Sequence, residues 1–192
     1  MYNSYMNYIP ISWNRLHGDT AKLADAIIAG GIKYDCIVAI ARGGLTVAHM
    51  LSDFLSLPVM TLTISSYMDT RQQHTPRVIY DVGASLYGKH ILMVDDISDT
   101  GDTFALATNY AHNRDCALIH TAAPYIKSHS HHIPDYYVDT IDDWVIYPYE
   151  LKETIRSLTR IWTVEGLNHH DCVRKLGELN FSADDIEKYM LP

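Results

Sequence analysis

The chain has 192 residues, a formal net charge of −8 and 47% hydrophobic residues. This length allows one compact domain with a small appendage but not two full domains, and the composition is that of a folded globular protein. Because the charge is acidic and no Lys/Arg stripe is present, binding to a nucleic-acid backbone or to an anionic membrane surface is disfavoured.

The first predicted elements are a helix, a buried strand and a second helix. Apolar residues at helical spacing after Ser12 predict a capped helix that ends at the glycine pair 30–31. The uninterrupted apolar run at 36–41 predicts a strand that is buried on both faces. Residues 42–44, Arg-Gly-Gly, then turn the chain into a helix with apolar residues up to Leu55.

The middle of the chain repeats this order of strand, turn and helix. Strands are predicted at 59–64 and 78–80, on either side of a polar segment, residues 65–77, which lacks apolar periodicity and is expected to be a mobile loop. The most apolar predicted strand, 91–94, runs into an acidic turn and then into a helix with apolar residues from 104 to 111.

Three further strands are predicted at 116–123, 136–141 and 144–147. Strands that alternate with helices predict an α/β fold with a mostly parallel sheet flanked by helices, and such sheets carry their sites at the carboxyl ends of the strands. From about Leu151 only helices are predicted, and the last one opens with a capping box at Ser182 and Asp185. We therefore expect a main domain at 1–150 and a C-terminal helical extension at 151–192 that serves packing or a subunit contact.

The acidic turn carries the densest chemical signal in the sequence. Asp95 and Asp96 directly follow the predicted buried strand, so their carboxylates can accept hydrogen bonds from vicinal hydroxyls or hold water bound to Mg²⁺ at the sheet edge. The next residues place backbone N–H groups and two hydroxyls at a helix N-terminus, which is a cradle for phosphate. These residues are Asp99, Thr100, Gly101, Asp102 and Thr103. Acids beside a phosphate cradle predict a sugar phosphate as ligand.

Residues 91–103, ILMVDDISDTGDT, resemble the motif with which type I phosphoribosyltransferases bind phosphoribosyl pyrophosphate, PRPP. The Walker A loop and the dinucleotide GxGxxG turn are both absent. Residues 37–45, IVAIARGGL, resemble the pyrophosphate loop of 6-oxopurine phosphoribosyltransferases. This resemblance, which covers about residues 8–150, implies that Arg42 and Gly43 contact the diphosphate and that the peptide bond before Arg42 is cis.

Two further stretches resemble the xanthine-guanine type of this family. Lys127 precedes residues 134–137, Pro-Asp-Tyr-Tyr, and in the family such a lysine donates to the purine O6. An ammonium group has donors but no acceptor, so it favours a 6-oxo over a 6-amino purine. Residues 144–150, WVIYPYE, resemble the family's base-binding segment, which implies that Trp144 stacks on the purine and that the Val145 backbone reads its edge.

The resemblance implies an enzyme that joins guanine, xanthine or hypoxanthine to PRPP, releases pyrophosphate and uses Mg²⁺. Asp95 and Asp96 would bind Mg²⁺ and the ribose hydroxyls, and Asp99 would be the general base that takes the N7 proton. In the loop expected to close over PRPP, Arg71 is the favoured partner of the diphosphate and Arg77 the competing one.

Asp102 departs from the family, whose members often carry Gly or Lys at this position. A carboxylate beside a phosphate is favourable only if it points outward. The departure therefore raises a question about the Asp102 side chain and not about the loop.

Two alternative functions stay open. A PRPP-sensing regulatory protein could keep the fold without catalysis, although Asp99 and Trp144 are both present. A phosphoribosyltransferase for adenine or a pyrimidine is disfavoured by Lys127 together with Trp144, and the ranking of the three oxopurines is not determined. A metal site on the histidines at 129–132 or 169–170 is disfavoured, because neither run pairs with a second cluster at zinc-ligand spacing.

The three cysteines are widely spaced, which predicts neither a disulfide framework nor a zinc ribbon. The N-terminus lacks the basic and apolar regions of a signal peptide, and no apolar run reaches the length of a membrane span, so we expect a cytoplasmic protein. The family resemblance implies a homodimer or homotetramer.

Overall fold

The computed structural model describes residues 7–65 and 76–190, which group into two compact units. The α/β unit comprises residues 16–142, and the helical unit comprises the described residues 7–15 and 143–190. Most of the predicted closing loop, including Arg71, lies outside the described residues. Residues 143–150, expected to belong with the α/β part, group with the C-terminal helices because their strand pairs with one near the N-terminus.

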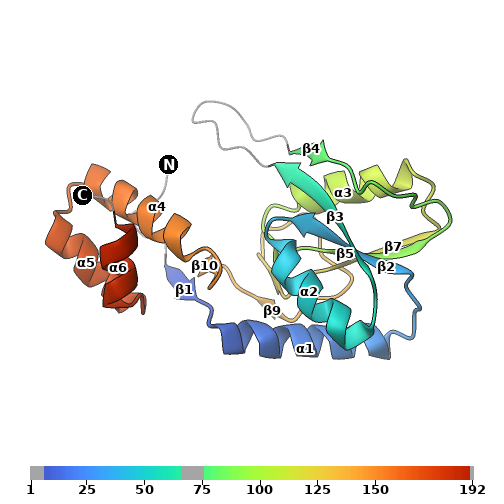
Figure 1. The fold of residues 1–192 in the computed structure, drawn as a ribbon, viewed down its shortest axis with the longest axis horizontal. Helices are drawn as coiled ribbons and strands as arrows, with labels where there is room; N and C mark the ends of the chain where they lie inside the picture. Colours follow the sequence, from blue (N-terminus) through green and yellow to red (C-terminus); the bar gives the residue numbers. More distant parts are fainter. Residues whose placement is uncertain (1–6, 66–75, 191–192) are drawn as a thin grey trace. The chain divides into compact units, whose positions relative to one another are not determined.

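The α/β unit is built on a five-stranded sheet with the strand order β4-β3-β2-β5-β7 (Figure 1). The strands are β2 (Cys36–Ala41), β3 (Val59–Ser65), β4 (Arg77–Tyr80), β5 (His90–Val94) and β7 (Leu118–Ala122). All pairs are parallel except that of the edge strand β4 with β3. The carboxyl ends of β2 and β5 lie side by side, with Ala39 opposite Val94. The predicted mostly parallel α/β fold is confirmed.

Three helices belong to this fold: α1 (Trp13–Ala29), α2 (Gly44–Leu55) and α3 (Asp102–His112). α1 begins where predicted, because Ser12 Oγ accepts a hydrogen bond from the Arg15 backbone N–H at 3.1 Å. α2 connects β2 to β3, and α3 lies in the connection from β5 to β7. These two connections run in opposite directions along the strand order. Right-handed crossovers therefore place α2 and α3 on opposite faces of the sheet (Figure 1).

The core of the α/β unit explains the uninterrupted apolar runs of β2 and β5. Side chains on both faces of the two strands are 0% exposed, among them Ile37, Val38, Ala39, Ile91, Leu92 and Met93. Phe104 and Ala107 of α3 pack against one of these faces. A central strand with helices above and below buries both rows of its side chains, so apolar residues follow one another without alternation.

A second, three-stranded parallel sheet is formed by β6 (Ile97–Ser98), β8 (Tyr125–Ile126) and β9 (Asp139–Thr140). The prediction of a strand at 136–141 is wrong for most of that range, because only the two residues of β9 form a strand there. The backbone N–H groups of Val138 and Asp139 both donate to the Pro124 carbonyl, at 3.1 and 3.2 Å, which interrupts a regular ladder. Tyr136 forms an isolated bridge with Ala122 instead.

The helical unit begins with β1 (Tyr8–Pro10), which pairs in parallel with β10 (Trp144–Ile146). The strand predicted at 144–147 is thus formed, but it belongs to a separate two-stranded sheet. The helices that follow are α4 (Leu151–Val164), α5 (His169–Glu178) and α6 (Ala183–Tyr189). They share one buried cluster that includes Ile155, Trp162 and Leu176.

Side-chain caps begin the last two helices. Asn168 Oδ1 accepts from the Asp171 backbone N–H at 3.0 Å, and Ser182 Oγ accepts from that of Asp185 at 3.1 Å. The second cap confirms the start predicted for the last helix. No helix in the described part of the chain combines the length and the apolar character that crossing a bilayer requires.

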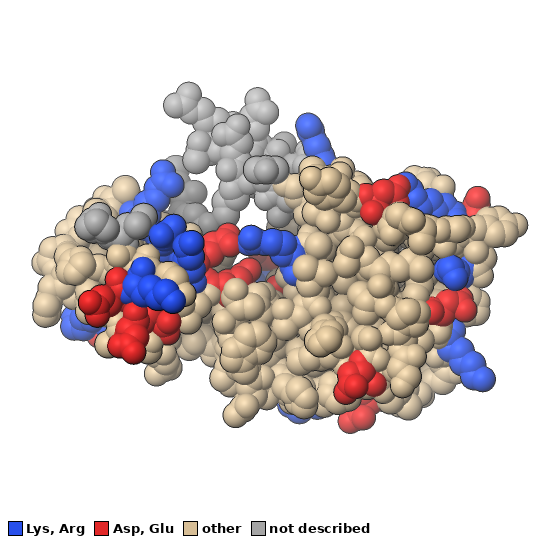
Figure 2. Space-filling model, in the orientation of Figure 1, with Lys and Arg blue, Asp and Glu red and all other residues tan. Residues whose placement is uncertain are grey.

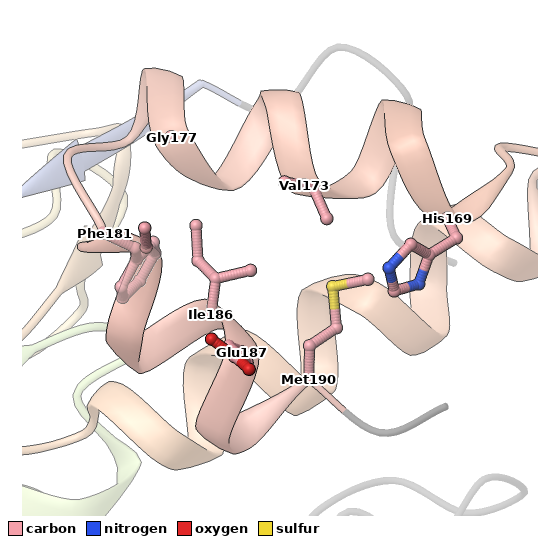
Figure 3. A pocket seen from close by; sticks show the side chains of 8 residues that line it. His169, Val173, Gly177, Phe181, Ile186, Glu187 and Met190 are labelled. Carbon is pink, nitrogen blue, oxygen red and sulfur yellow. The ribbon is translucent and has the colours of Figure 1, made fainter.

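The helical unit also contains a cavity of about 460 Å³ between α5 and α6 (Figure 3). Val173, Ile186 and Met190 give it a largely apolar lining, to which His169 and Glu187 add polar groups. None of the residues predicted to bind substrate line this cavity. Among the described residues that Figure 2 shows, Lys and Arg side chains lie beside Asp and Glu side chains.

Candidate active site

Two buried carboxylates mark the carboxyl end of β5. Asp95 and Asp96 are each only 8% exposed. The Asp95 backbone N–H donates to the Ala122 carbonyl at 3.1 Å, which ties the strand end to β7, and the Asp96 backbone N–H donates to Asp95 Oδ1 at 2.9 Å. Burial, reinforced by the adjacent carboxyl of Asp96, raises the pKa of Asp95 well above its usual range. Burying like charges costs stability, so such a pair indicates a functional site.

The Arg-Gly-Gly turn after β2 lies directly against these acids. The peptide bond between Ala41 and Arg42 is cis, as the resemblance implied. A Cβ atom on Gly43 would overlap the carboxyl group of Asp96, and one on Gly44 would lie 2.9 Å from Asp95 Cα. Only glycine therefore allows the turn to approach so closely. Two motifs separated by about fifty residues are thus brought together at the adjacent ends of β2 and β5.

The predicted phosphate cradle forms the start of α3. Gly101 precedes the helix with φ +95°, a conformation that favours glycine, and its carbonyl accepts from the Ala105 N–H at 3.0 Å. Gly101, the residue before the helix, has no side chain with which to cap it. Thr100 Oγ1 accepts a hydrogen bond from the Asp102 backbone N–H at 3.3 Å and donates to Asp102 Oδ2 at 2.9 Å. The other N–H groups of the first helical turn, with the positive end of the helix dipole, are donors that an anion could use.

The segment Lys127–His132, which we call the histidine loop, forms a second wall of this site, and the sequence had predicted a binding role only for Lys127. The Lys127 backbone N–H donates to the Ser98 carbonyl, and the His131 N–H donates to the Thr100 carbonyl, each at 3.0 Å. Ser98 Oγ also donates to the His132 carbonyl at 2.8 Å. The histidine loop therefore runs alongside residues 98–100. The run His-Ser-His-His after Lys127 was the available signal, but surface loops carry such residues freely.

Two imidazoles of the histidine loop pair with two carboxylates of the cradle. His129 Nε2 lies 3.2 Å from Asp99 Oδ1, and His131 Nε2 lies 3.4 Å from Asp102 Oδ1. All four side chains are more than half exposed. Within the described ranges, no three His, Cys, Asp or Glu side chains group together in a way that could hold a metal ion.

The third imidazole has a packing role. The ring of His132 stacks on Phe104, with centroids 5.1 Å apart and planes 15° apart, and its Nε2 lies 3.2 Å from Thr121 Oγ1. Burial lowers the pKa of His132, so this ring stays neutral to lower pH than a solvated imidazole. A Cβ atom on Gly101 would lie 2.6 Å from the His132 backbone nitrogen, so the histidine loop packs tightly on the cradle.

The remaining predicted residues lie in different surroundings. Lys127 is 6% exposed, a rare degree of burial for a lysine, at the carboxyl end of β8. Arg42 is exposed, as is Arg77 at the start of β4, and Arg71 lies outside the described residues. Trp144 and Val145 are part of β10 in the helical unit, where Trp144 is 37% exposed and Val145 is buried. The other predicted residues all lie in the α/β unit, where Gly43 packs on Asp96 and the Lys127 backbone is bonded to Ser98, next to the cradle. These residues are Gly43, Asp95, Asp96, Asp99, Thr100, Gly101, Asp102, Thr103 and Lys127.

Comparisons with known proteins identify the family of the chain. The family model of the phosphoribosyl transferase domain matches residues 12–154. The xanthine-guanine phosphoribosyltransferase of Nitratidesulfovibrio vulgaris (strain Hildenborough) is 30% identical over 149 residues, which cover 76% of this chain and 86% of that protein. That of Idiomarina loihiensis is 31% identical over 143 residues, or 73% and 86% of the two chains. The crystal structure of a purine phosphoribosyltransferase from Pyrococcus horikoshii superposes with a TM-score of 0.68 at 27% identity and covers 75% of this chain and 94% of that one.

Proposed function

The chain belongs to the phosphoribosyltransferase family, and we propose that it is a purine salvage enzyme that joins guanine, xanthine or hypoxanthine to PRPP. The observation that carries this proposal is the buried pair Asp95 and Asp96, which packs against a glycine turn and is followed in the chain by the helix start at Gly101. The pair offers acceptors for vicinal ribose hydroxyls, and the helix start offers donors for a phosphate. A ribose 5-phosphate carries both vicinal hydroxyls and a phosphate.

The residues present also fit Mg²⁺. Mg²⁺ in proteins is commonly held by one or two carboxylates together with substrate phosphates. Burial and the neighbouring Asp96 raise the pKa of Asp95, and a bound cation would offset the repulsion between the two carboxylates. Asp95 and Asp96 would hold the ion, which would supply positive charge to the diphosphate. We expect Mg²⁺ with PRPP to raise the melting temperature of the protein at neutral pH, and EDTA to abolish both this rise and turnover.

The transfer step needs charge stabilisation and one proton acceptor. N9 of the base forms a bond to C1′ of the ribose while the bond from C1′ to the diphosphate oxygen breaks, and the pyrophosphate leaves with the electron pair. Arg42 on the turn after β2 would neutralise the departing diphosphate. The proton on N7 of the base would pass to Asp99, whose side chain is 55% exposed and thus open to a ligand.

Recognition of the base rests on fewer observations. Lys127 is buried one residue beyond β8, and its backbone bond to Ser98 places it beside the segment that leads to Asp99. A buried ammonium that donates to the purine O6 accounts for a 6-oxopurine preference. The roles of Trp144 in stacking and of Val145 in reading the base edge are proposed from the family resemblance. Trp144→Ala should then raise the KM for the base more than it changes kcat.

Product analysis tests the proposal. The protein is incubated with PRPP and Mg²⁺ and, in turn, guanine, xanthine, hypoxanthine or adenine, and nucleoside monophosphate is measured by chromatography. We expect product from at least one 6-oxopurine and little or none from adenine. Product from adenine alone would favour the adenine enzyme, and PRPP binding without product from any base would favour the regulatory protein. Absence of both binding and product would overturn the proposal.

We further propose that the enzyme is cytoplasmic and, as the family resemblance implies, a homodimer or homotetramer. Size-exclusion chromatography with light scattering measures the mass directly, and a mass of one chain at micromolar concentration would contradict the second part.

A further inference from the structure

Asp102 lies where a negative charge opposes the proposed function. It is the first residue of α3, whose amide groups would bind the phosphate of PRPP, and its side chain is 51% exposed. A carboxylate at a helix N-terminus favours the helix itself, but it repels a second anion at the same place. Some feature of the protein must hold this carboxylate away from a bound phosphate.

Both oxygens of Asp102 have a partner in the structure. Oδ2 accepts a hydrogen bond from Thr100 Oγ1 at 2.9 Å, and Oδ1 lies 3.4 Å from His131 Nε2. Thr100 belongs to the cradle itself, whereas His131 comes from the histidine loop. One oxygen of the carboxylate is therefore held by a hydroxyl of the cradle, and the other faces the histidine loop.

Backbone hydrogen bonds and the contacts of its two neighbours place His131 beside the cradle. Its N–H donates to the Thr100 carbonyl at 3.0 Å, and on either side of it Ser130 Oγ bonds to Ser98 Oγ at 2.9 Å and the His132 ring stacks on Phe104. A backbone anchored in this way keeps His131 beside the cradle, which lowers the entropic cost of the pair with Asp102.

We propose that His131 is a positioning residue that holds the Asp102 carboxylate outside the phosphate cradle and so permits PRPP to bind. This inference rests on the proposed function. His131 would act through its Nε2–H on Asp102 Oδ1 and would not touch the substrate. The nearby charged and titratable groups are Asp99 with its partner His129, and His132 with Asp135.

A double-mutant cycle tests this role. His131→Ala should raise the KM for PRPP by about 3–10-fold, because the freed carboxylate can turn toward the phosphate, while kcat changes by less than about twofold. Asp102→Asn removes the charge that needs to be held, so adding His131→Ala to Asp102→Asn should leave the KM for PRPP within about twofold of that of Asp102→Asn alone. His131→Gln keeps an N–H donor and should stay close to the wild type.

His129→Ala is the matched control, because it removes an equally exposed imidazole of the same loop that pairs with Asp99 instead. Any effect of His129→Ala should be the same with Asp102 or Asn at position 102. Calorimetric PRPP binding is measured beside turnover, with melting temperatures to establish that each variant is folded. A His131→Ala effect that is equal in both backgrounds, or absent in both, overturns this inference. Failure of the wild type to bind PRPP would instead overturn the proposed function.

Discussion

The two compact units bury different kinds of residue. Among the described residues, the buried polar and charged side chains all lie in the α/β unit: Asp19, Thr20, Asp95, Asp96, Ser98, Thr121 and Lys127. The buried residues of the helical unit are apolar, and its last two helices start with side-chain caps. Burying a charged group costs stability unless it is paired, and unfavourable buried groups are concentrated at functional sites. The acids proposed to bind the ribose and the phosphate therefore lie in the α/β unit, whereas the core of the helical unit is held together by apolar packing.

Removing the proposed general base should have the largest effect. Asp99→Asn should lower kcat by about 10²–10⁴-fold and leave PRPP binding intact, because a single proton acceptor contributes about that much to a transfer step. Asp184→Asn, an exposed acid of α6 in the helical unit, is the control and should keep kcat. Steady-state kinetics checks both. Unchanged turnover in Asp99→Asn would remove this residue from the mechanism.

The next largest effect is expected from a substitution that creates a cavity in the core of the helical unit. Leu176→Ala deletes a side chain that is 0% exposed in the cluster of α4, α5 and α6, and it should lower the free energy of unfolding by about 2–5 kcal/mol. Urea unfolding followed by circular dichroism measures the loss, and Val164→Ala, at an 84% exposed position of α4, is the control. A loss below about 1 kcal/mol would show that the cluster is less tightly packed than its burial indicates.

Neutralising a buried acid should stabilise the α/β unit. The pKa of Asp95 is raised above its unfolded value of 3.8, so the stability linked to its protonation is complete below that pH and is lost as pH rises through the folded pKa. Asp95→Asn, which stays neutral and keeps an acceptor for the Asp96 N–H, should therefore raise the melting temperature at pH 7, by about 2–4 °C for each kcal/mol. Activity should fall at the same time.

The neighbouring acid sharpens that prediction. Asp96→Asn should also raise the melting temperature, and the double variant should gain less than the sum of the two, because each substitution relieves the same repulsion. Strictly additive gains in calorimetric melting experiments would show that the two carboxyls do not interact.

Two glycines provide the smallest expected effect and a direct comparison of the units. Gly18 of α1 and Gly177 of α5 lie inside helices, and a Cβ atom on either would meet nothing within 4 Å. Each Gly→Ala change should raise the free energy of unfolding by about 0.5–1 kcal/mol through helix propensity. Gly44→Ala, where Cβ would overlap the Val94 carbonyl, should do the opposite. Urea unfolding distinguishes the two signs.

Local pattern determined much of this protein. The apolar run at 36–41 became β2 with the predicted bounds, Ser12 and Ser182 cap their helices, and the strand-turn-helix order led to the confirmed α/β fold. The placement of Asp95 and Asp96 at a strand end followed from the same reading. Each of these features depends on residues close together in the chain, where burial and capping impose a period or a residue type.

Contacts between distant segments were decided only by the tertiary structure. The pairing of β10 with β1, the reduction of 136–141 to β9, and the packing of the histidine loop on residues 98–100 have no periodic signature in the sequence. They depend on which backbone groups find a partner once the main sheet has formed. The sequence alone thus located the acids and the phosphate turn, and the folded chain decided that His131 stands beside Asp102, because hydrogen bonds across thirty residues depend on three-dimensional proximity and leave no local pattern.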